Sequence, residues 1–215
     1  ADFANRLAKH LIADSDKTMS EPAILANLLP KIHACKICQA QLPLGPRPIV
    51  QLNPNARLLL IGQAPGKLAH EHRKPFSDPS GDRLRAWLGL SPAEFYDENL
   101  VAIMPMAFCY PGKLNSGSGD KAPPKICAQT WHERIRATLP QIELTLLIGR
   151  YAAEQYQTQF NDVTSAVKAQ SIEDSDSLVL PHPSPRNNIW LKKNDWFERK
   201  TLPKIRQRLQ EVLRT

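Results

Sequence analysis

Four short apolar runs stand out along the chain, at residues 58–61, 100–104, 144–148 and 178–180. Apolar runs of this length, bounded by turn residues, predict strands that are buried on both faces. Between and around them, apolar residues recur at helical spacing over 81–90, 125–138, 150–160 and 195–213. Two further helices are predicted over 3–13 and 21–34, ahead of the first run.

This alternation of strands and helices predicts a three-layer α/β/α fold with a central, mostly parallel four-stranded sheet. In such a sheet the carboxyl ends of all strands meet at one edge, where ligand sites form. Gln63, Pro105, Arg150 and His182 each follow one of the predicted strands. We therefore expect these four residues to converge.

The length of 215 residues and the 42% hydrophobic content suit one core, and so a single domain over residues 1–215 with a helical segment at about 1–34. No apolar stretch approaches the roughly 20 residues that a bilayer crossing needs. The N-terminus lacks a signal-peptide core. We expect a soluble, cytoplasmic monomer without a membrane partner, and a flexible loop over residues 114–124.

The chain carries 28 Lys and Arg residues against 21 Asp and Glu, a net charge of +7. Such a surface attracts polyanions, and nucleic acid is the leading partner class.

The four cysteines form a second signal, with Cys35 and Cys38 separated by two residues and Cys109 and Cys127 following later. In an intracellular chain this pattern favours a metal site over a disulfide. Four thiolates suit either tetrahedral zinc or an iron–sulfur cluster, and spacing does not separate the two. The alternative is four unrelated buried thiols.

Two stiff turns follow strands and carry polar groups: Gly-Gln-Ala-Pro-Gly at residues 62–66 and His-Pro-Ser-Pro at 182–185. With Pro-Phe at 75–76 ahead of Ser-Gly at 80–81, and with the order of the cysteines, they resemble the uracil-DNA glycosylase superfamily, nearest its iron–sulfur branch (family 4). The resemblance spans about residues 33–200. It implies the sheet fold predicted above and favours a 4Fe-4S cluster over zinc.

The resemblance also implies a function in base excision repair, the hydrolysis of the N-glycosidic bond of a deaminated or damaged base in single- or double-stranded DNA. Such enzymes flip the nucleotide into a pocket before cleaving the bond. Carried over to this chain, Gly62, Gln63, Ala64 and Gly66 lie beside the sugar and base. Phe76 stacks on the flipped base. His182 stabilises the negative charge that develops on it.

The first motif departs from the family pattern because Gln63 stands where the iron–sulfur branch has a glutamate. Ala64 stands where the best-known uracil glycosylases have a water-activating aspartate. Neither side chain can act as a general base. Asp78, in a stretch similar to one in family 5, is the expected water-activating acid. The alternative is that Asp78 only caps a helix N-terminus.

A second departure concerns base recognition, because Pro105 falls where the iron–sulfur branch has a base-reading asparagine. Proline has no side-chain donor or acceptor. We expect Met104, with Met106 and Phe108, to flank a softer, more apolar pocket. Uracil is the first candidate substrate, with hypoxanthine or xanthine as alternatives.

The turn after the last strand is the expected DNA contact, through Ser184, Arg186 and Asn187, with Lys192 close behind. Ile189 or Trp190 is either a wedge into the base stack or a core residue. His70 and His72 are expected on a polar surface loop. The alternative function is a catalytically weak DNA-binding relative that senses damage, because the motif acids and the base-reading asparagine are replaced.

Overall fold

The computed structural model describes residues 19–116 and 119–214, so the helix predicted over residues 3–13 lies outside the described residues. The strands are β1 (Leu58–Ile61), β2 (Val101–Ile103), β3 (Leu144–Ile148) and β4 (Ser177–Leu180). They form one sheet in the order β2-β1-β3-β4, and every pair is parallel. The predicted α/β fold and all four predicted strands are thereby confirmed.

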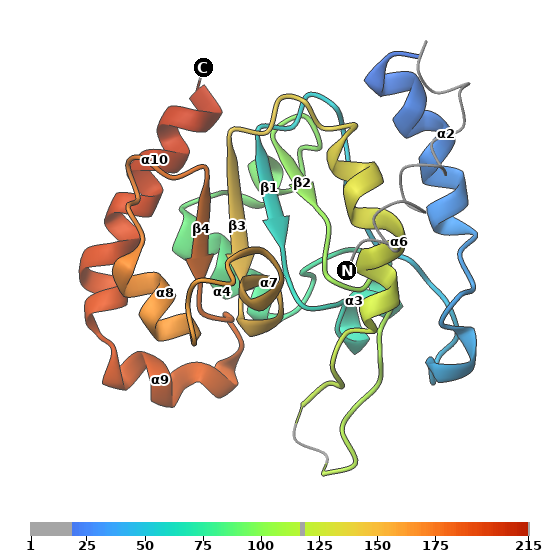
Figure 1. Ribbon diagram of the computed structural model, residues 1–215. Coiled ribbons are helices and arrows are strands. Elements are labelled where there is room, and N and C mark those ends of the chain that lie inside the picture. Colours follow the sequence, from blue (N-terminus) through green and yellow to red (C-terminus); the bar gives the residue numbers. More distant parts are fainter. Residues whose placement is uncertain (1–18, 117–118, 215) are drawn as a thin grey trace.

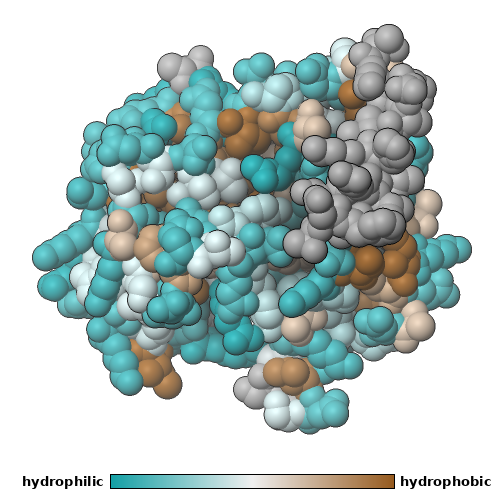
Figure 2. Space-filling view, viewed as in Figure 1, coloured by the Kyte–Doolittle hydropathy of each residue, from teal (hydrophilic) through white to brown (hydrophobic). Residues whose placement is uncertain are grey.

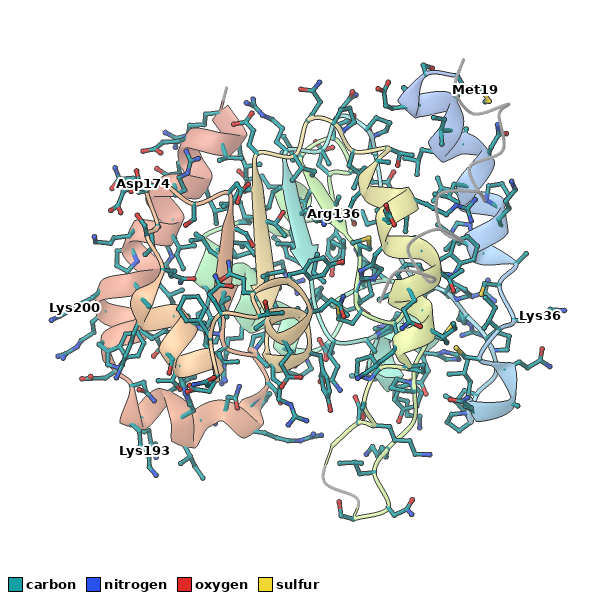
Figure 3. All side chains as sticks on the ribbon, viewed as in Figure 1. Met19, Lys36, Arg136, Asp174, Lys193 and Lys200 are labelled. Atoms are coloured by element: carbon teal, nitrogen blue, oxygen red, sulfur yellow. The ribbon has the colours of Figure 1, made fainter. Side chains whose placement is uncertain are left out.

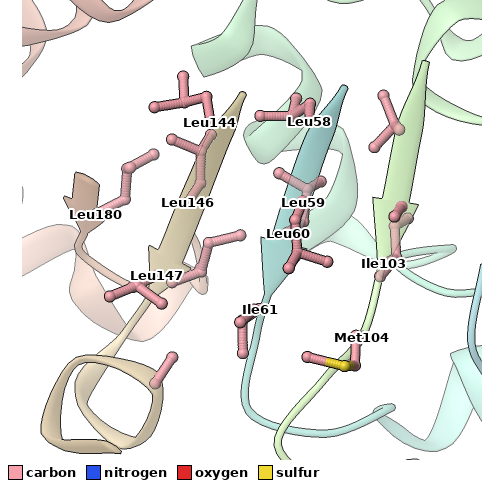
Figure 4. Close-up of a cluster of buried hydrophobic side chains, with 14 of the residues drawn as sticks. Leu58, Leu59, Leu60, Ile61, Ile103, Met104, Leu144, Leu146, Leu147 and Leu180 are labelled. Atoms are coloured by element: carbon pink, nitrogen blue, oxygen red, sulfur yellow. The ribbon is translucent and has the colours of Figure 1, made fainter. Parts of the chain in front are cut away.

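The strands are apolar on both faces because helices cover both faces (Figure 4). Helices α6 (Lys125–Arg136) and α7 (Arg150–Tyr156) lie in front of the sheet in Figure 1, and α4 (Pro79–Leu88) lies behind it. Helix α10 (Leu202–Arg214) packs against α4. The sheet is thus the middle layer of three, which leaves its ends as the places where a ligand can enter.

The remaining helices are short, apart from α2. They are α2 (Glu21–His33), α3 (Lys67–His72), α5 (Pro92–Phe95), α8 (Val163–Ala169) and α9 (Asn188–Lys193), with the 3-10 turns η2 (Gln39–Gln41) and η3 (Pro185–Asn187) and the π-helical turn η4 (Phe197–Thr201). Helices α3, α5, α8 and α9 were not predicted, because each has too few turns for a clear apolar period.

Two helix predictions need correction. The helix predicted over 150–160 ends at Tyr156, because Gln157 leaves the helical conformation (φ −134°), and a new helix starts after Asp162, whose side chain accepts a hydrogen bond from the Ser165 N–H at 3.0 Å. The basic helix predicted over 195–213 is η4 followed by α10.

Long loops leave the sheet at its carboxyl edge, the lower edge in Figure 1. The segment after β2 continues alongside the first motif, since the N–H of Met106 donates to the Gly62 carbonyl at 2.8 Å. The loop predicted over 114–124 has paired ends: Leu114 N–H donates to the Gly119 carbonyl and Lys121 N–H to the Gly112 carbonyl, both at 2.8 Å. In residues 19–116 and 119–214, no helix has the length and apolar character that membrane crossing requires.

Candidate active site at the carboxyl edge of the sheet

A cavity of about 310 Å³ opens at the carboxyl edge. Its walls come from the three segments that follow β1, β2 and β4. The lining residues include Gly62, Gln63, Ala64, Gly66, Phe76, Asp78, Pro105, Asp120, His182, Ser184, Arg186 and Asn187. An adjoining hollow is lined by Gln63, Arg150 and His182 together. The predicted convergence of Gln63, Pro105, Arg150 and His182 is therefore confirmed.

Phe76 lies on one wall in a left-handed backbone conformation, with φ 50°. Its carbonyl accepts hydrogen bonds from Arg85 Nη1 and the Tyr96 hydroxyl, both at 3.1 Å. A Cβ added at Gly62 would lie 3.1 Å from Phe76 Cζ, and one at Gly81 only 1.7 Å from the Phe76 carbonyl oxygen. Two glycines and two hydrogen bonds thus hold a strained aromatic residue at the cavity.

His182 is held by the turn that follows it. The Ser184 N–H donates to His182 Nδ1 at 3.2 Å, and Asn187 Nδ2 donates to the His182 carbonyl at 2.7 Å. Burial lowers the pKa of the imidazole, Arg186 lowers it further, and Asp78 opposes the shift. A neutral ring that accepts at Nδ1 carries its proton on Nε2, which can donate to a ligand.

Asp78 has two roles in the geometry. Its Oδ1 accepts from the Gly81 N–H at 3.0 Å and caps α4. Its Oδ2 would lie 3.7 Å from a Cβ at Gly66, on the cavity wall. Asp78 therefore both caps the N-terminus of α4 and lines the cavity.

Gln63 Nε2 donates to the Lys121 carbonyl at 3.1 Å, so this side chain fastens the first motif to the loop after β2. That contact positions Asp120, a cavity-lining acid that sequence reasoning missed. Burial and the nearby Asp78 raise the pKa of Asp120, while Arg186 and Lys113 oppose the shift. Asp120 follows a Gly- and Ser-rich stretch that reads as an ordinary loop, and no sequence pattern marks it as functional.

Ile103 and Pro105 line the cavity where base recognition is predicted. Met104 is fully buried in the core and does not line the cavity, and Phe108 is buried as well. Side chains alternate along an extended segment, so Met104 points away from the face that its two neighbours present.

The Pro105 carbonyl is engaged by a buried histidine. His132 Nε2 lies 3.0 Å from the Pro105 oxygen, and its Nδ1 lies 2.6 Å from the Tyr156 hydroxyl. A carbonyl only accepts, so Nε2 carries the proton and Tyr156 donates to Nδ1. Burial lowers the pKa of His132 to about 4, which keeps this arrangement neutral.

Three of the four predicted DNA-contacting residues line the cavity, Asn187 among them. Ser184 and Arg186 line the cavity, whereas Lys192 is exposed on α9 and does not. Ile189 is 69% exposed. Trp190 instead packs against Trp196, and its Nε1 donates to Thr164 Oγ1 at 2.9 Å. Figure 2 shows a mostly hydrophilic face, with apolar patches near the top, on the right side and at the lower edge.

The four cysteines lie around a second, smaller cavity beside α6, with apolar neighbours that include Leu42, Pro48 and Trp131. None of these cysteines forms a disulfide. The Arg47 N–H donates to Cys109 Sγ at 3.3 Å and the Phe108 N–H to Cys127 Sγ at 3.4 Å. Segments far apart in the sequence thus bring four thiols to one place.

The electrostatics of this second cavity favour protonated thiols when nothing is bound. Burial raises the pKa of Cys109 to about 11 and that of Cys127 to about 12, and the neighbouring cysteines add to both shifts. A bound cation reverses this preference. In the described part of the chain, no three His, Cys, Asp or Glu side chains are arranged to hold a single metal ion.

His70 contradicts its predicted surface position, since it is only 3% exposed. Its carbonyl accepts from Arg47 Nη1 at 2.7 Å, and Arg47 also contacts Cys109 through its backbone. Arg47 therefore connects the cysteine cavity to α3, the helix that follows the first motif. His72 is exposed, with Nδ1 3.2 Å from Ser77 Oγ.

The chain is similar in sequence to a known enzyme superfamily. Residues 49–206 match the uracil DNA glycosylase superfamily. A solution NMR structure from Methanosarcina acetivorans, provisionally assigned as a uracil DNA glycosylase, is 16% identical, with a TM-score of 0.44 over 75% of this chain and 97% of that one. The sequence match covers more than half of the chain and includes both motifs at the cavity. The chain therefore belongs to the uracil DNA glycosylase superfamily.

Proposed function

We propose that this protein is a DNA glycosylase of base excision repair that hydrolyses the N-glycosidic bond of a deaminated base, with uracil first and hypoxanthine or xanthine as alternatives. One observation carries the proposal: a cavity of about 310 Å³, with room for a nucleobase, is lined by both a fixed aromatic ring, Phe76, and a neutral histidine, His182. Base removal requires a side chain that stacks on the flipped base and a donor that stabilises the negative charge on the departing base.

Phe76 is proposed to stack on the flipped base. Such stacking is worth roughly 1 to 3 kcal/mol and tolerates any base. Its left-handed backbone, fixed by Arg85 and Tyr96, keeps the ring in place before the base arrives. Phe76 supplies affinity for a base without choosing which base.

His182 is proposed to stabilise the departing base. Cleavage leaves negative charge on the base, and a neutral Nε2–H donor aimed at the base stabilises such charge. Removing one donor of this kind typically costs about 100- to 1,000-fold in rate. The turn over residues 184–187 sets the ring orientation through its two hydrogen bonds.

Base choice is proposed to depend on acceptors rather than on an asparagine side chain at position 105. The amides of Gln63 and Asn187 each donate to a backbone carbonyl, which orients them within the cavity wall. Their oxygens remain as acceptors. Deamination turns the ring nitrogen acceptor of cytosine or adenine into an N–H donor, so an acceptor-lined cavity favours uracil over cytosine and hypoxanthine over adenine.

DNA is proposed to lie across the lower edge of the molecule. Ser184, Arg186 and Lys192 would contact phosphates, and Asn187 would contact the nucleotide beside them. Ile189 would enter the base stack, because it is exposed whereas Trp190 is packed against Trp196.

The cysteine cavity is proposed to hold a 4Fe-4S cluster on Cys35, Cys38, Cys109 and Cys127. A single zinc ion with 2.3 Å bonds would need its sulfurs roughly 3.8 Å apart. A cluster places each thiolate on its own iron and so needs a wider ring. The cluster is supported by four thiols around one cavity, by two N–H groups that donate to sulfur, and by the finding that no three side chains of the described residues are arranged to hold a single metal ion. When bound, it would tie α2, α6 and the loop after β2 together.

Anaerobic purification tests the cluster. We expect a brown protein with about four irons and four sulfides per chain, and loss of both iron and stability in Cys109→Ser. A colourless protein with one zinc per chain would contradict the cluster while keeping a four-thiolate site.

Single-turnover base release tests the glycosylase. Matched single- and double-stranded oligonucleotides carrying uracil, hypoxanthine or xanthine are incubated with wild type, His182→Ala and Phe76→Ala. We expect release that His182→Ala lowers about 100-fold or more.

The second candidate function is that of a damage sensor, favoured by Gln63 and Ala64 at the acid positions. It predicts salt-sensitive binding to damaged DNA without release of a base.

A further inference from the structure

Asp120 is brought into the cavity by a loop that is fastened at both ends. The backbone pairs of Leu114 with Gly119 and of Gly112 with Lys121, both at 2.8 Å, close the loop on itself. The Gln63 side chain then ties its Lys121 carbonyl to the first motif. The carboxylate is therefore positioned by the same motif that lines the cavity floor.

Asp120 and Asp78 converge on one point of the wall. A Cβ at Gly66 would meet Asp78 Oδ2 at 3.7 Å and Asp120 Oδ2 at 3.9 Å. Because Gly66 has no side chain, that point is open to the cavity. Asp78 is partly committed, since its other oxygen caps α4. Within residues 19–116 and 119–214, the Asp120 carboxylate has no hydrogen-bond donor, so it is free to bind a water molecule.

Three charged side chains and one hydroxyl surround the Asp120 carboxylate. Arg186 on η3 and Lys113 on the same loop as Asp120 attract the carboxylate, and Asp78 at the start of α4 repels it. Burial raises the pKa of the Tyr110 hydroxyl, and the Asp120 charge adds to that rise. Burial and Asp78 prevail, so the pKa of Asp120 is raised. A carboxylate with a raised pKa is a stronger base towards water than an ordinary aspartate.

We propose that Asp120 is the general base of the reaction, with Asp78 holding the same water molecule through Oδ2. This assignment rests on the proposed glycosylase function and supplies the acid that the first motif lacks. The water oxygen bonds to the sugar C1′ as the C1′–N bond breaks. The electron pair of that bond leaves with the base, next to His182, and the water proton passes to Asp120. Asp120 later returns that proton to the base or to solvent.

Single-turnover base release across pH tests this assignment. We expect Asp120→Asn to lower the rate about 100- to 10,000-fold, and to abolish the fall in rate that wild type shows as the pH drops through the pKa of Asp120. Glu71→Gln is the matched control, because Glu71 is an exposed acid on α3 that pairs with Lys67. Its rate should equal that of wild type.

Folding of the variant is checked by thermal unfolding. The folded protein disfavours the Asp120 charge, so Asp120→Asn should keep or raise the melting temperature while it loses activity. Gly66→Ala is a second variant: its backbone (φ −74°) accepts alanine, and the methyl group would be in ordinary contact with both carboxylates and displace the water. It should fold normally and release base slowly.

The outcomes separate the two proposals. Wild-type release that Asp120→Asn and Gly66→Ala leave intact, while His182→Ala abolishes it, would overturn the role of Asp120 and leave the glycosylase standing. No release by wild type from any substrate would overturn both.

Discussion

Single residues at the cavity are held by their neighbours in conformations that they would not adopt alone. Phe76 has a positive φ that costs a non-glycine residue about 1 kcal/mol or more. Arg85 donates to its carbonyl, and the Tyr96 hydroxyl shares its one proton between this carbonyl and that of Pro75; together these contacts offset the cost. Strain of this kind at a candidate active site indicates that the ring position has a function.

Removal of one of these bonds should therefore affect both stability and function. Tyr96→Phe is expected to cost about 1 kcal/mol in the free energy of unfolding and to weaken binding to DNA that carries a damaged base. Tyr151→Phe is the control, because within residues 19–116 and 119–214 the one hydrogen bond of the Tyr151 hydroxyl is accepted from the exposed Arg150 at 2.9 Å. Urea unfolding and fluorescence anisotropy measure the two effects. Equal behaviour of the two variants would contradict the support role of Tyr96.

His132 predicts a pH dependence of stability. Its pKa falls from 6.5 in the unfolded chain to about 4 in the folded protein. The folded state binds this proton less well, so the stabilisation is complete above pH 6.5 and is lost as the pH falls towards 4, by about 3 kcal/mol in total.

The comparison variant is His132→Gln, which can hydrogen-bond but does not titrate. Its stability deficit against wild type, from urea unfolding, should shrink as the pH falls from 7 to 4. A deficit that stays constant across this range would contradict the buried neutral histidine.

At the scale of elements, helix α4 and the segment before it must approach closely. A Cβ at Gly81 would overlap the Phe76 carbonyl oxygen at 1.7 Å, whereas one at Gly45 (φ 73°) would meet nothing within 4 Å. Gly81→Ala should therefore cost roughly 3 kcal/mol or more through overlap with backbone. Gly45→Ala should cost only about 1 to 2 kcal/mol for its left-handed conformation. Thermal unfolding of the two variants would reveal the difference, and similar melting temperatures would contradict the close approach.

The sequence pattern predicts an element clearly where nearly every residue of that element is buried, as in the strands, and less clearly where the element is short and partly exposed. The leucine-rich strands are buried on both faces, so their apolar runs mark them clearly. Helices α3, α5 and α8 are too short for a period, although the cap at Asp162 and the Ser91–Glu94 capping box were readable signals. Asp120 could not be predicted, because its burial depends on a contact between Gln63 and Lys121, which are far apart in the sequence.

At the scale of the whole molecule, the net charge of +7 favours DNA, but only some lysines lie where DNA is proposed to bind. Figure 3 places Lys193, the neighbour of Lys192, at the lower edge, and Lys200 away from it. Lys192→Ala should lower the slope of log K against log salt by about 1. Lys200→Ala should leave the slope unchanged. Equal slopes in the two variants would argue against DNA binding at the lower edge.

The central claim is that the cavity removes a base. The most direct measurement is mass spectrometry of the free bases and DNA products after excess wild-type protein, or His182→Ala, has acted on one pool of oligonucleotides carrying uracil, hypoxanthine, xanthine or no damage. The account predicts one or more free deaminated bases and the matching abasic strands with wild type, with little or none from His182→Ala. Intact strands with both proteins, or equal release by both, would contradict it.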